Sequence, residues 1–279
     1  MLAWLFRFAA RLPLRALHAL GAALGRLALA LSSSWRRKTV DNLRTAGLFS
    51  DELLREAARQ AGRGLLETPY VWFRPRSELE SLVRLDNMSL IQEAVAAGRG
   101  AIVLTPHLGC FEVAARMAAR LVPMTVLYKP PKLEAVRRLV EQARAVPGMR
   151  AVPANAGGVR SLLRALRRGE AIGILPDQVP GDGDGAWAPF FGRPAYTMTL
   201  PQRLAELTGA TVLMAAAERL PGGAGYRVHI ERLEGDASPA AVNAAMEALI
   251  RRFPAQYYWG YNRYKTPARA RAAGEGAAA

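Results

Sequence analysis

The chain is poor in the residues that build disulfide and metal frameworks. Its 279 residues include one cysteine and three histidines. A single cysteine excludes an intramolecular disulfide and a cysteine-rich zinc site, and three histidines leave little for a histidine-rich metal site. The sequence matches neither the phosphate-binding P-loop nor the dinucleotide-binding fingerprint, and it has no serine in a G-x-S-x-G elbow. Nucleotide-dependent and serine-hydrolase chemistry are therefore not indicated.

Acidic residues are scarce relative to basic ones. There are 38 lysines and arginines against 23 aspartates and glutamates, which gives a formal net charge of +15. Such a balance predicts an anionic partner, for example nucleic acid, an anionic membrane surface, an acidic carrier protein or a phosphorylated lipid. Motifs of nucleic-acid-binding domains are absent, and the basic residues are not interleaved with an aromatic platform, so no nucleic-acid partner is expected.

The amino-terminal segment has no long hydrophobic run without charge. Residues 1–31 are rich in leucine and alanine and are expected to be helical, but no 18-residue window in them is free of cationic groups. A simple membrane-spanning helix is therefore disfavoured, and we interpret the segment as a basic anchor lying in a membrane interface. A soluble packing helix or a partner-binding helix is the alternative. The cationic side chains are expected to form one stripe (Arg7, Arg11, Arg15, His18 and Arg26).

From Ala101 onward, short apolar runs alternate with helical patterns. Strands are predicted at 101–105, 122–128, 150–153, 171–176, 211–217 and 225–233, with helices at 109–121, 132–145, 157–168, 197–208 and 238–253. This alternation predicts a mixed, largely parallel α/β sheet flanked by helices. The last strand alternates apolar and polar residues, as an antiparallel strand with one solvated face would. One domain is expected over residues 32–266, followed by a disordered tail at 267–279.

A histidine lies directly beyond the first of these strands. Thr105-Pro106 ends the apolar run, His107 follows, and a helix is expected from about Gly109. Ligands of α/β sheets bind beyond the carboxyl ends of strands, so His107 stands where a catalytic residue would. Glu112, in the first turn of the helix, could reach back and orient the imidazole as in a general-base pair. A loop histidine beside a first-turn glutamate is the alternative.

Other candidate residues follow later strands and helices. Lys129 ends the second strand, Arg144 closes the next helix and Arg150 opens the third strand; each is a candidate for binding an acidic headgroup or phosphate. Asp177, a further candidate for binding substrate, ends the fourth strand and opens a glycine- and proline-rich loop. Arg193 follows Phe190-Phe191-Gly192 and returns a cation towards the site.

Together these stretches resemble the lysophospholipid acyltransferase superfamily, specifically its late lipid A (lauroyl/myristoyl) acyltransferase branch. The resemblance rests on the order of T-P-H-x-G-x-F-E around His107, Tyr128-Lys-Pro, Arg144, Leu175-Pro-Asp-Gln and Pro189-Phe-Phe-Gly-Arg-Pro, and on the terminal Pro254-Ala-Gln-Tyr-Tyr-Trp. It spans nearly the whole chain and implies a glycerolipid acyltransferase-like fold. The catalytic pair of the family maps onto His107 and Glu112. Its further functional arginine and aspartate map onto Arg144 and Asp177, with Arg150 as the alternative to Arg144.

The resemblance implies an O-acyltransferase at the cytoplasmic face of the inner membrane. His107, polarised by Glu112, would take the proton from a lipid A precursor hydroxyl as it attacks the thioester of an acyl carrier protein, with no metal or cofactor. Arg144, Arg193 and Lys129 would bind phosphates of the acceptor or donor. The same chemistry on a lysophospholipid or aminolipid acceptor stays open, as does a non-catalytic basic membrane-binding protein.

Overall fold

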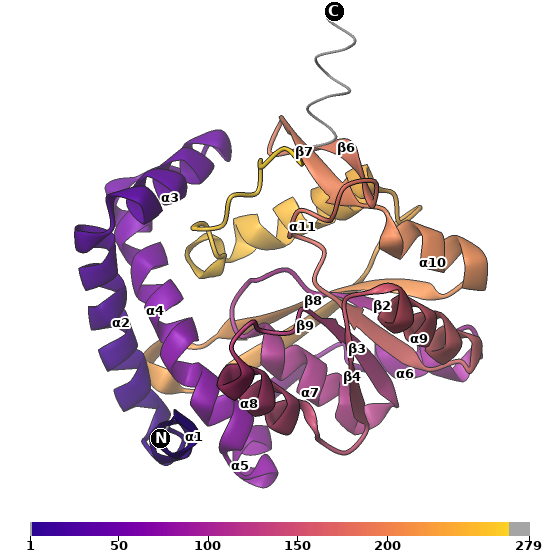
Figure 1. Cartoon of the computed structure of the whole chain (residues 1–279), viewed down its shortest axis with the longest axis horizontal. Coiled ribbons are helices and arrows are strands. Elements are labelled where there is room, and N and C mark those ends of the chain that lie inside the picture. Colours follow the sequence, from indigo (N-terminus) through magenta and orange to yellow (C-terminus); the bar gives the residue numbers. More distant parts are fainter. Residues whose placement is uncertain (1, 268–279) are drawn as a thin grey trace, which may run out of the picture.

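A seven-stranded sheet forms the centre of the molecule (Figure 1). The structure, a computed structural model, describes residues 2–267, so the predicted tail lies almost entirely outside the described residues. The strand order is β1-β9-β8-β2-β5-β3-β4. Its strands are β1 (Val83–Asp86), β2 (Ala101–Leu104), β3 (Met124–Tyr128), β4 (Met149–Pro153), β5 (Ala171–Ile174), β8 (Thr211–Arg219) and β9 (Tyr226–Arg232).

The sheet is mixed and largely parallel, as predicted. Neighbours from β8 to β4 all run parallel, whereas β8 and β9 form an antiparallel pair and β1 runs parallel to β9. The carboxyl ends of β2, β3, β4, β5 and β8 therefore meet along one edge of the sheet. The β9 prediction is confirmed, because its alternating burial fits an antiparallel strand with one partly wet face.

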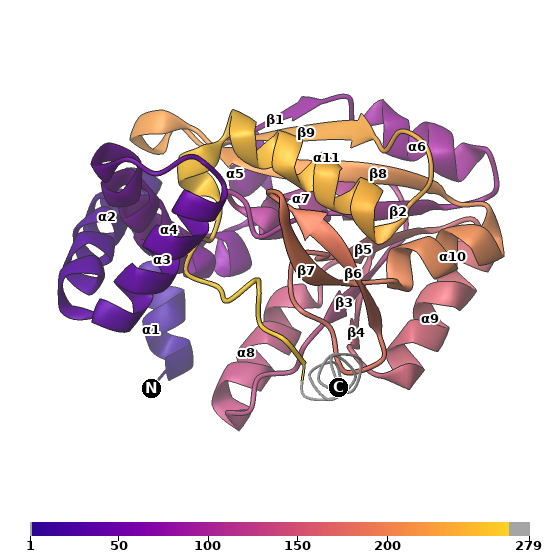
Figure 2. The ribbon, with the colours of Figure 1, turned by 90° about the horizontal axis from the view of Figure 1, so that it is seen from above.

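Helices cover both faces of the sheet, as Figure 2 shows. Side chains alternate along β2: Ala101 and Val103 join the core beneath α6 and α7, while Ile102 and Leu104 join the core beneath α9, α10 and α11. The helices that follow α5 (Arg76–Ser81) are α6 (Ser89–Ala96), α7 (Phe111–Leu121), α8 (Glu134–Arg144), α9 (Ala156–Arg167), α10 (Leu200–Thr208) and α11 (Pro239–Arg252), and a short 3-10 turn η2 (Pro254–Gln256) follows α11.

The amino-terminal segment forms two helices rather than the single one expected over residues 1–31. They are α1 (Leu2–Ala9) and α2 (Leu14–Leu31), and Pro13 immediately precedes α2. Proline lacks an N–H and disfavours the α conformation at the residue before it, which is Leu12, so the helix ends and restarts there. Two more helices, α3 (Ser33–Thr45) and α4 (Asp51–Phe73), begin at side-chain caps from Ser32 and Ser50.

Helix α2 packs closely on α4. A Cβ added at Gly25 would lie 1.9 Å from the Ala58 carbonyl oxygen, and one at Gly62 would lie 1.9 Å from the Gly21 carbonyl oxygen. The two helix backbones thus come into close contact at glycine positions. Gly21 and Gly25 are among the buried residues of α2. One of the described helices, α2, is long and apolar enough to cross a membrane, with a mean hydropathy of 1.4, and a third of it is buried in the fold.

Three strands were absent from the sequence-based prediction. Strand β1 pairs with β9 at the sheet edge, and β6 (Gly185–Phe190) pairs with β7 (Arg193–Met198) as a separate antiparallel hairpin. The sequence predicts a loop in the glycine- and proline-rich stretch after Asp177, and a helix over residues 197–208 that would include residues 197–198 of β7. The hairpin packs Phe190 and Ala195 into the core beside α11, so tertiary burial rather than local pattern stabilises it.

Candidate active site

His107 lies in a tight turn between the carboxyl end of β2 and the start of α7. The turn contains Pro106, whose carbonyl accepts from the Leu108 N–H at 2.7 Å. The carbonyl of His107 accepts from the N–H of Tyr258 at 3.0 Å, and the ring of Phe111 meets the imidazole edge-on. Backbone contacts and packing thus hold the imidazole at the strand end, as the sequence predicted.

Asp177 is the carboxylate that hydrogen-bonds His107. Its Oδ1 lies 2.8 Å from His107 Nδ1, and its Oδ2 accepts from the His107 backbone N–H at 2.9 Å. The pairing follows from topology, because β5 lies next to β2 in register and Asp177 follows β5 as His107 follows β2. Asp177 was predicted to bind substrate, and its contact with the imidazole was not foreseen.

The pair has complementary electrostatics. Burial lowers the pKa of His107, but the charge and hydrogen bond of Asp177, with a further contribution from Glu112, outweigh burial and raise it. Burial raises the pKa of Asp177, yet its interactions with His107 lower it overall. The ionised Asp177 can only accept a hydrogen bond, so Nδ1 carries the proton and the neutral imidazole presents a lone pair at Nε2.

Glu112 pairs with Arg144 rather than with the imidazole. Arg144 Nη2 donates to Glu112 Oε1, and the guanidinium lies over the ring of Tyr128 at 5.4 Å. The hydrogen bond to His107 that was expected from Glu112 is therefore made by Asp177 instead. Glu112 still faces the same cavity as His107, and its charge contributes to raising the pKa of His107. The catalytic role of Glu112 and the substrate-binding role of Arg144 stay predictions.

The remaining predicted cations are exposed. Lys129 follows β3 at the carboxyl edge of the sheet, whereas Arg150 lies on the edge strand β4 in register with Thr125, near the start of β3. The structure therefore brings Arg144, and not Arg150, to the site. Arg193 begins β7 and stacks over the ring of Tyr264 at 4.5 Å.

The carboxy-terminal segment contributes residues that sequence reasoning did not assign to the site. Tyr257 is buried, and burial together with the Asp177 carboxylate raises its pKa well above the ordinary value. Outside this segment, Gln178 directly follows Asp177, and its Nε2 lies 3.4 Å from His107 Nε2. The stretch from Pro254 to Trp259 was part of the family resemblance, so its aromatic residues were the sequence feature that could have indicated Tyr257 as a site residue. Within residues 2–267, no group of three His, Cys, Asp or Glu side chains is placed to hold a metal ion.

A cavity of about 550 Å³ lies between the helices α2 and α4 and the His107 turn. His107, Phe111 and Glu112 line one side. The wall from α2, α3 and α4 is largely apolar, through Leu24, Ala28, Trp35, Leu65 and Val71, although α4 also contributes the polar Gln60, Glu67 and Thr68. Leu24 and Leu65 are also exposed on the outer surface, at 42% and 69%. The histidine therefore faces an apolar cavity bordered by exposed leucines.

Comparison with known proteins identifies the class to which this architecture belongs. Residues 1–266 match the family model described as bacterial lipid A biosynthesis acyltransferase. A lipid A biosynthesis palmitoleoyltransferase of Escherichia coli K12 is 30% identical over 225 residues, covering 77% of this chain and 72% of the relative. The lipid A biosynthesis lauroyltransferase of the same strain is 27% identical over 274 residues, covering 92% and 87%. A lipid A biosynthesis acyltransferase of Haemophilus influenzae is 25% identical over 223 residues, covering 77% and 70%. This chain belongs to the bacterial lipid A biosynthesis acyltransferase family.

Proposed function

We propose that this protein transfers a fatty acyl chain from the thioester of an acyl carrier protein to a hydroxyl group of a lipid A precursor, with His107 as general base. The hydrogen bond between Nδ1 and Asp177 carries the proposal, because it leaves Nε2 as the proton-accepting nitrogen beside an apolar cavity. Family membership supports the acceptor class.

The proposed transfer is direct. The acceptor oxygen attacks the thioester carbonyl carbon while His107 Nε2 takes the hydroxyl proton. The carbon–sulfur bond then breaks, and the imidazolium returns its proton to the leaving thiolate. Cys110 is an unsuitable nucleophile, because burial and the Glu67 carboxylate raise the pKa of its thiol well above the ordinary value.

The cavity provides a place for the acyl chain. Its wall from α2, α3 and α4 is lined by leucine, alanine, valine and tryptophan side chains, which favour a hydrocarbon over water. In the proposed complex the chain lies along this wall and the thioester carbon lies beside His107.

Cationic side chains around the site match anionic substrates. Arg144 is engaged by Glu112, and in the proposal it aligns that carboxylate near the imidazole. Lys129 and Arg193 are exposed and are the predicted contacts for acceptor phosphates or for the acidic carrier protein. Arg150 lies near the start of β4, away from the carboxyl end of the sheet, and in this proposal it contributes only to the overall positive charge of the surface.

The amino-terminal helices would hold the enzyme at the cytoplasmic face of the inner membrane. Leu20, Leu24, Leu27 and Leu31 recur at helical spacing on the exposed side of α2, and Trp4, Leu5 and Phe8 extend the apolar surface along α1. Arg7, Arg11, Arg15 and Arg26 are exposed beside them. An apolar stripe flanked by arginines suits a helix lying in an anionic lipid interface.

The proposal is tested with purified enzyme, a lauroyl or myristoyl carrier-protein thioester and a lipid A precursor as acceptor. We expect acyl transfer by the wild type and loss of about 10²–10⁴-fold in kcat for His107→Ala. His229→Gln is the matched control, because His229 lies on β9 and contacts Glu218 and Asp86. Wild-type rates in His107→Ala would refute the general-base role.

Parallel reactions with acyl-coenzyme A and with a lysophospholipid acceptor address donor and acceptor separately. A higher kcat/KM with the coenzyme thioester would overturn the carrier-protein donor. Faster transfer to the lysophospholipid would overturn the lipid A acceptor while leaving the chemistry intact.

A further inference from the structure

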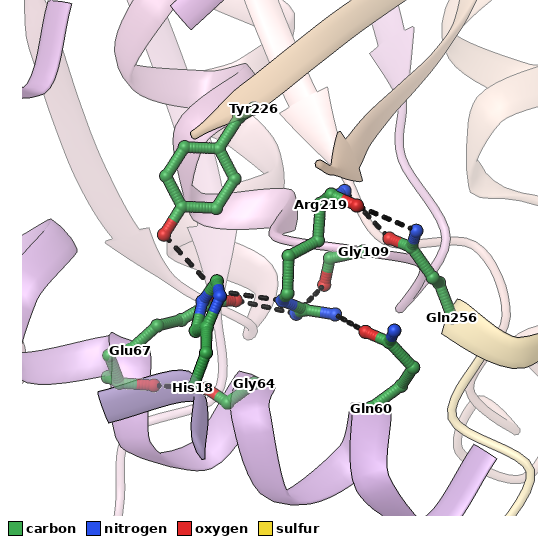
Figure 3. A network of polar contacts seen from close by, with 9 residues as sticks. His18, Gln60, Gly64, Glu67, Gly109, Arg219, Tyr226 and Gln256 are labelled. Carbon is green, nitrogen blue, oxygen red and sulfur yellow. Dashed lines mark hydrogen bonds and ion pairs between the residues drawn. The ribbon is translucent and has the colours of Figure 1, made fainter. Parts of the chain in front are cut away.

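A buried ion pair lies directly behind the His107 turn. Arg219, at the end of β8, and Glu67, in α4, are 4% and 1% exposed. Arg219 Nη2 donates to Glu67 Oε1 at 2.5 Å, and Nε donates to Oε2 at 2.8 Å, which makes the pair bidentate (Figure 3). Neither residue has a role that was predicted from the sequence.

The pair is the centre of a larger polar network. Glu67 Oε2 also lies 2.8 Å from His18 Nε2 and accepts from the Tyr226 hydroxyl at 3.1 Å, while Arg219 Nη1 donates to Gln60 Oε1 at 2.8 Å. His18, which the sequence placed on an exposed cationic stripe, is therefore buried and serves to join α2 to this network (Figure 3).

The network reaches the backbone of the catalytic turn. Arg219 Nη2 donates to the Gly109 carbonyl at 3.1 Å, two residues beyond His107. The Gly109 N–H donates to the Gln256 carbonyl at 3.0 Å, and the Gln256 side chain holds both the N–H and the carbonyl of Arg219. Gly109 has a positive φ of 60°, and a Cβ there would lie 1.9 Å from the Ala217 carbonyl oxygen. The turn thus lies directly against β8, and its Gly109 carbonyl accepts a hydrogen bond from the Arg219 guanidinium.

Two simpler roles fit this arrangement less well. Arg219 lines the cavity, but its Nε, Nη1 and Nη2 are engaged by Glu67, Gln60 and Gly109, so it has little left to offer a substrate phosphate. A role in stability alone is also weakly supported, because apolar replacement of a buried ion pair is often neutral or stabilising.

We propose that Arg219 and Glu67 are positioning residues that hold the Gly109 carbonyl, and through it the turn that carries His107. In this proposal, the packing of α2 and α4 against β8 determines the direction in which His107 Nε2 points in the cavity. The proposal rests on the proposed role of His107 as the base. A displacement of about 1 Å at a reacting group can reduce the rate about 10²-fold, so a small rotation of this turn is enough to matter.

The first test is the double variant Arg219→Met with Glu67→Leu, which removes both charges and leaves neither unpaired. We expect a folded protein whose kcat is reduced about 10²-fold, while KM for the acyl donor changes little. The matched control is Arg232→Met with Glu93→Leu, an exposed pair 3.1 Å apart between β9 and α6. Wild-type kcat in the folded Arg219/Glu67 variant would overturn the proposal.

Arg219→Lys keeps the proposal testable if the double variant does not fold. A lysine retains a positive charge for Glu67 but lacks the planar fork that reaches Gln60 and the Gly109 carbonyl together. We expect near-wild-type thermal stability with kcat reduced at least about tenfold, because one orienting contact of the turn is lost. Wild-type kcat in this variant would argue against positioning.

An activity-independent readout separates failure of this proposal from failure of the proposed function. The chain has three histidines, so the His107 ring signal can be assigned by NMR with a His107→Gln variant. Loosening of the turn weakens the contact with Asp177, so the titration midpoint of His107 is expected to fall in the Arg219 variants even if no acyl transfer is found. An unchanged midpoint together with unchanged kcat would reject the positioning role alone.

Discussion

At the residue scale, the central feature is an imidazole held by a carboxylate from a neighbouring strand. Asp177 contacts both the backbone N–H and Nδ1 of His107, so one side chain sets the position and the tautomer of the ring. Glu112 is near enough to act through its charge, but its hydrogen bond goes to Arg144. Neutralising Asp177 and neutralising Glu112 are therefore expected to change the rate and its pH dependence to different extents.

Asp177→Asn is expected to change both the rate and its pH dependence. Asp177 raises the pKa of His107, so its loss lowers that pKa. The base is active when neutral and the rate rises with pH through its pKa, so the acidic limb of kcat/KM should move to lower pH. The plateau should fall by at least about 10²-fold, because the ring loses its orienting partner.

Glu112→Gln is the comparison variant for this pH profile. Glu112 makes the smaller contribution to the pKa of His107, so the acidic limb should move in the same direction but less far. A larger displacement for Glu112→Gln than for Asp177→Asn would identify Glu112 as the main partner of the imidazole during turnover.

At the element scale, the close packing of α2 on α4 depends on glycines at the contact, which have no side chain. The glycines let the backbones meet, and the cavity wall and the His18–Glu67 contact both depend on that approach. The break at Pro13 separates α1 from this packed unit. Helix α2 is thus part of the folded body as well as the candidate membrane contact.

Gly25→Ala is expected to destabilise the protein. The added methyl would overlap the Ala58 carbonyl oxygen at 1.9 Å, so the helices must move apart. Overpacking of this kind costs about 1–3 kcal/mol, which corresponds to a fall in Tm of several degrees, on the order of 2–4 °C for each kcal/mol. Leu20→Ala, on the exposed side of the same helix, is the control for thermal unfolding. Equal Tm values for the two variants would show that the glycine contact is not tight.

At the scale of the whole molecule, charge and exposed apolar surface point to an anionic lipid interface. The chain carries a net charge of +15, and exposed leucines belong to α2. Helix α2 is part of the layer formed by α1–α4, which lies on the opposite side of the molecule from α10 (Figures 1 and 2). The cavity beside His107 borders the same layer. An enzyme docked through this layer would have its cavity next to the membrane.

The triple variant Leu20→Gln, Leu27→Gln and Leu31→Gln should lose vesicle binding. These side chains are 53%, 53% and 77% exposed, and burying a leucine in hydrocarbon is worth about 1.5–3 kcal/mol, so partitioning should fall by more than about 100-fold. Flotation with vesicles containing phosphatidylglycerol measures the effect. Wild-type binding should also weaken on neutral vesicles and at high salt.

Leu207→Gln is the matched control for flotation, because Leu207 is 65% exposed on α10. Point substitutions are preferable to deletion of residues 1–31, since deletion would also remove the buried Leu14, Leu17 and His18. Unchanged flotation of the triple variant would reject docking through α2.

Features that depend on the local order of residues could be predicted from the sequence alone. Apolar runs and helical periodicity located most strands and helices from Ala101 onward, because burial imposes those periods on neighbouring residues. Thr105-Pro106 predicted that His107 follows a strand end, because proline has no N–H to donate to a strand ladder. The excess of arginine in a leucine-rich amino-terminal segment indicated an anionic surface as partner.

Which side chains from distant segments come into contact could be seen only in the folded structure. Asp177 reaches His107 across 70 residues because β5 lies beside β2 in register, whereas chain proximity had favoured Glu112. Arg219, Glu67 and His18 come together because α2, α4 and β8 converge behind the turn, and the β6–β7 hairpin forms because α11 covers it. Such contacts depend on strand register and helix packing between distant segments, and no local period in the sequence records them.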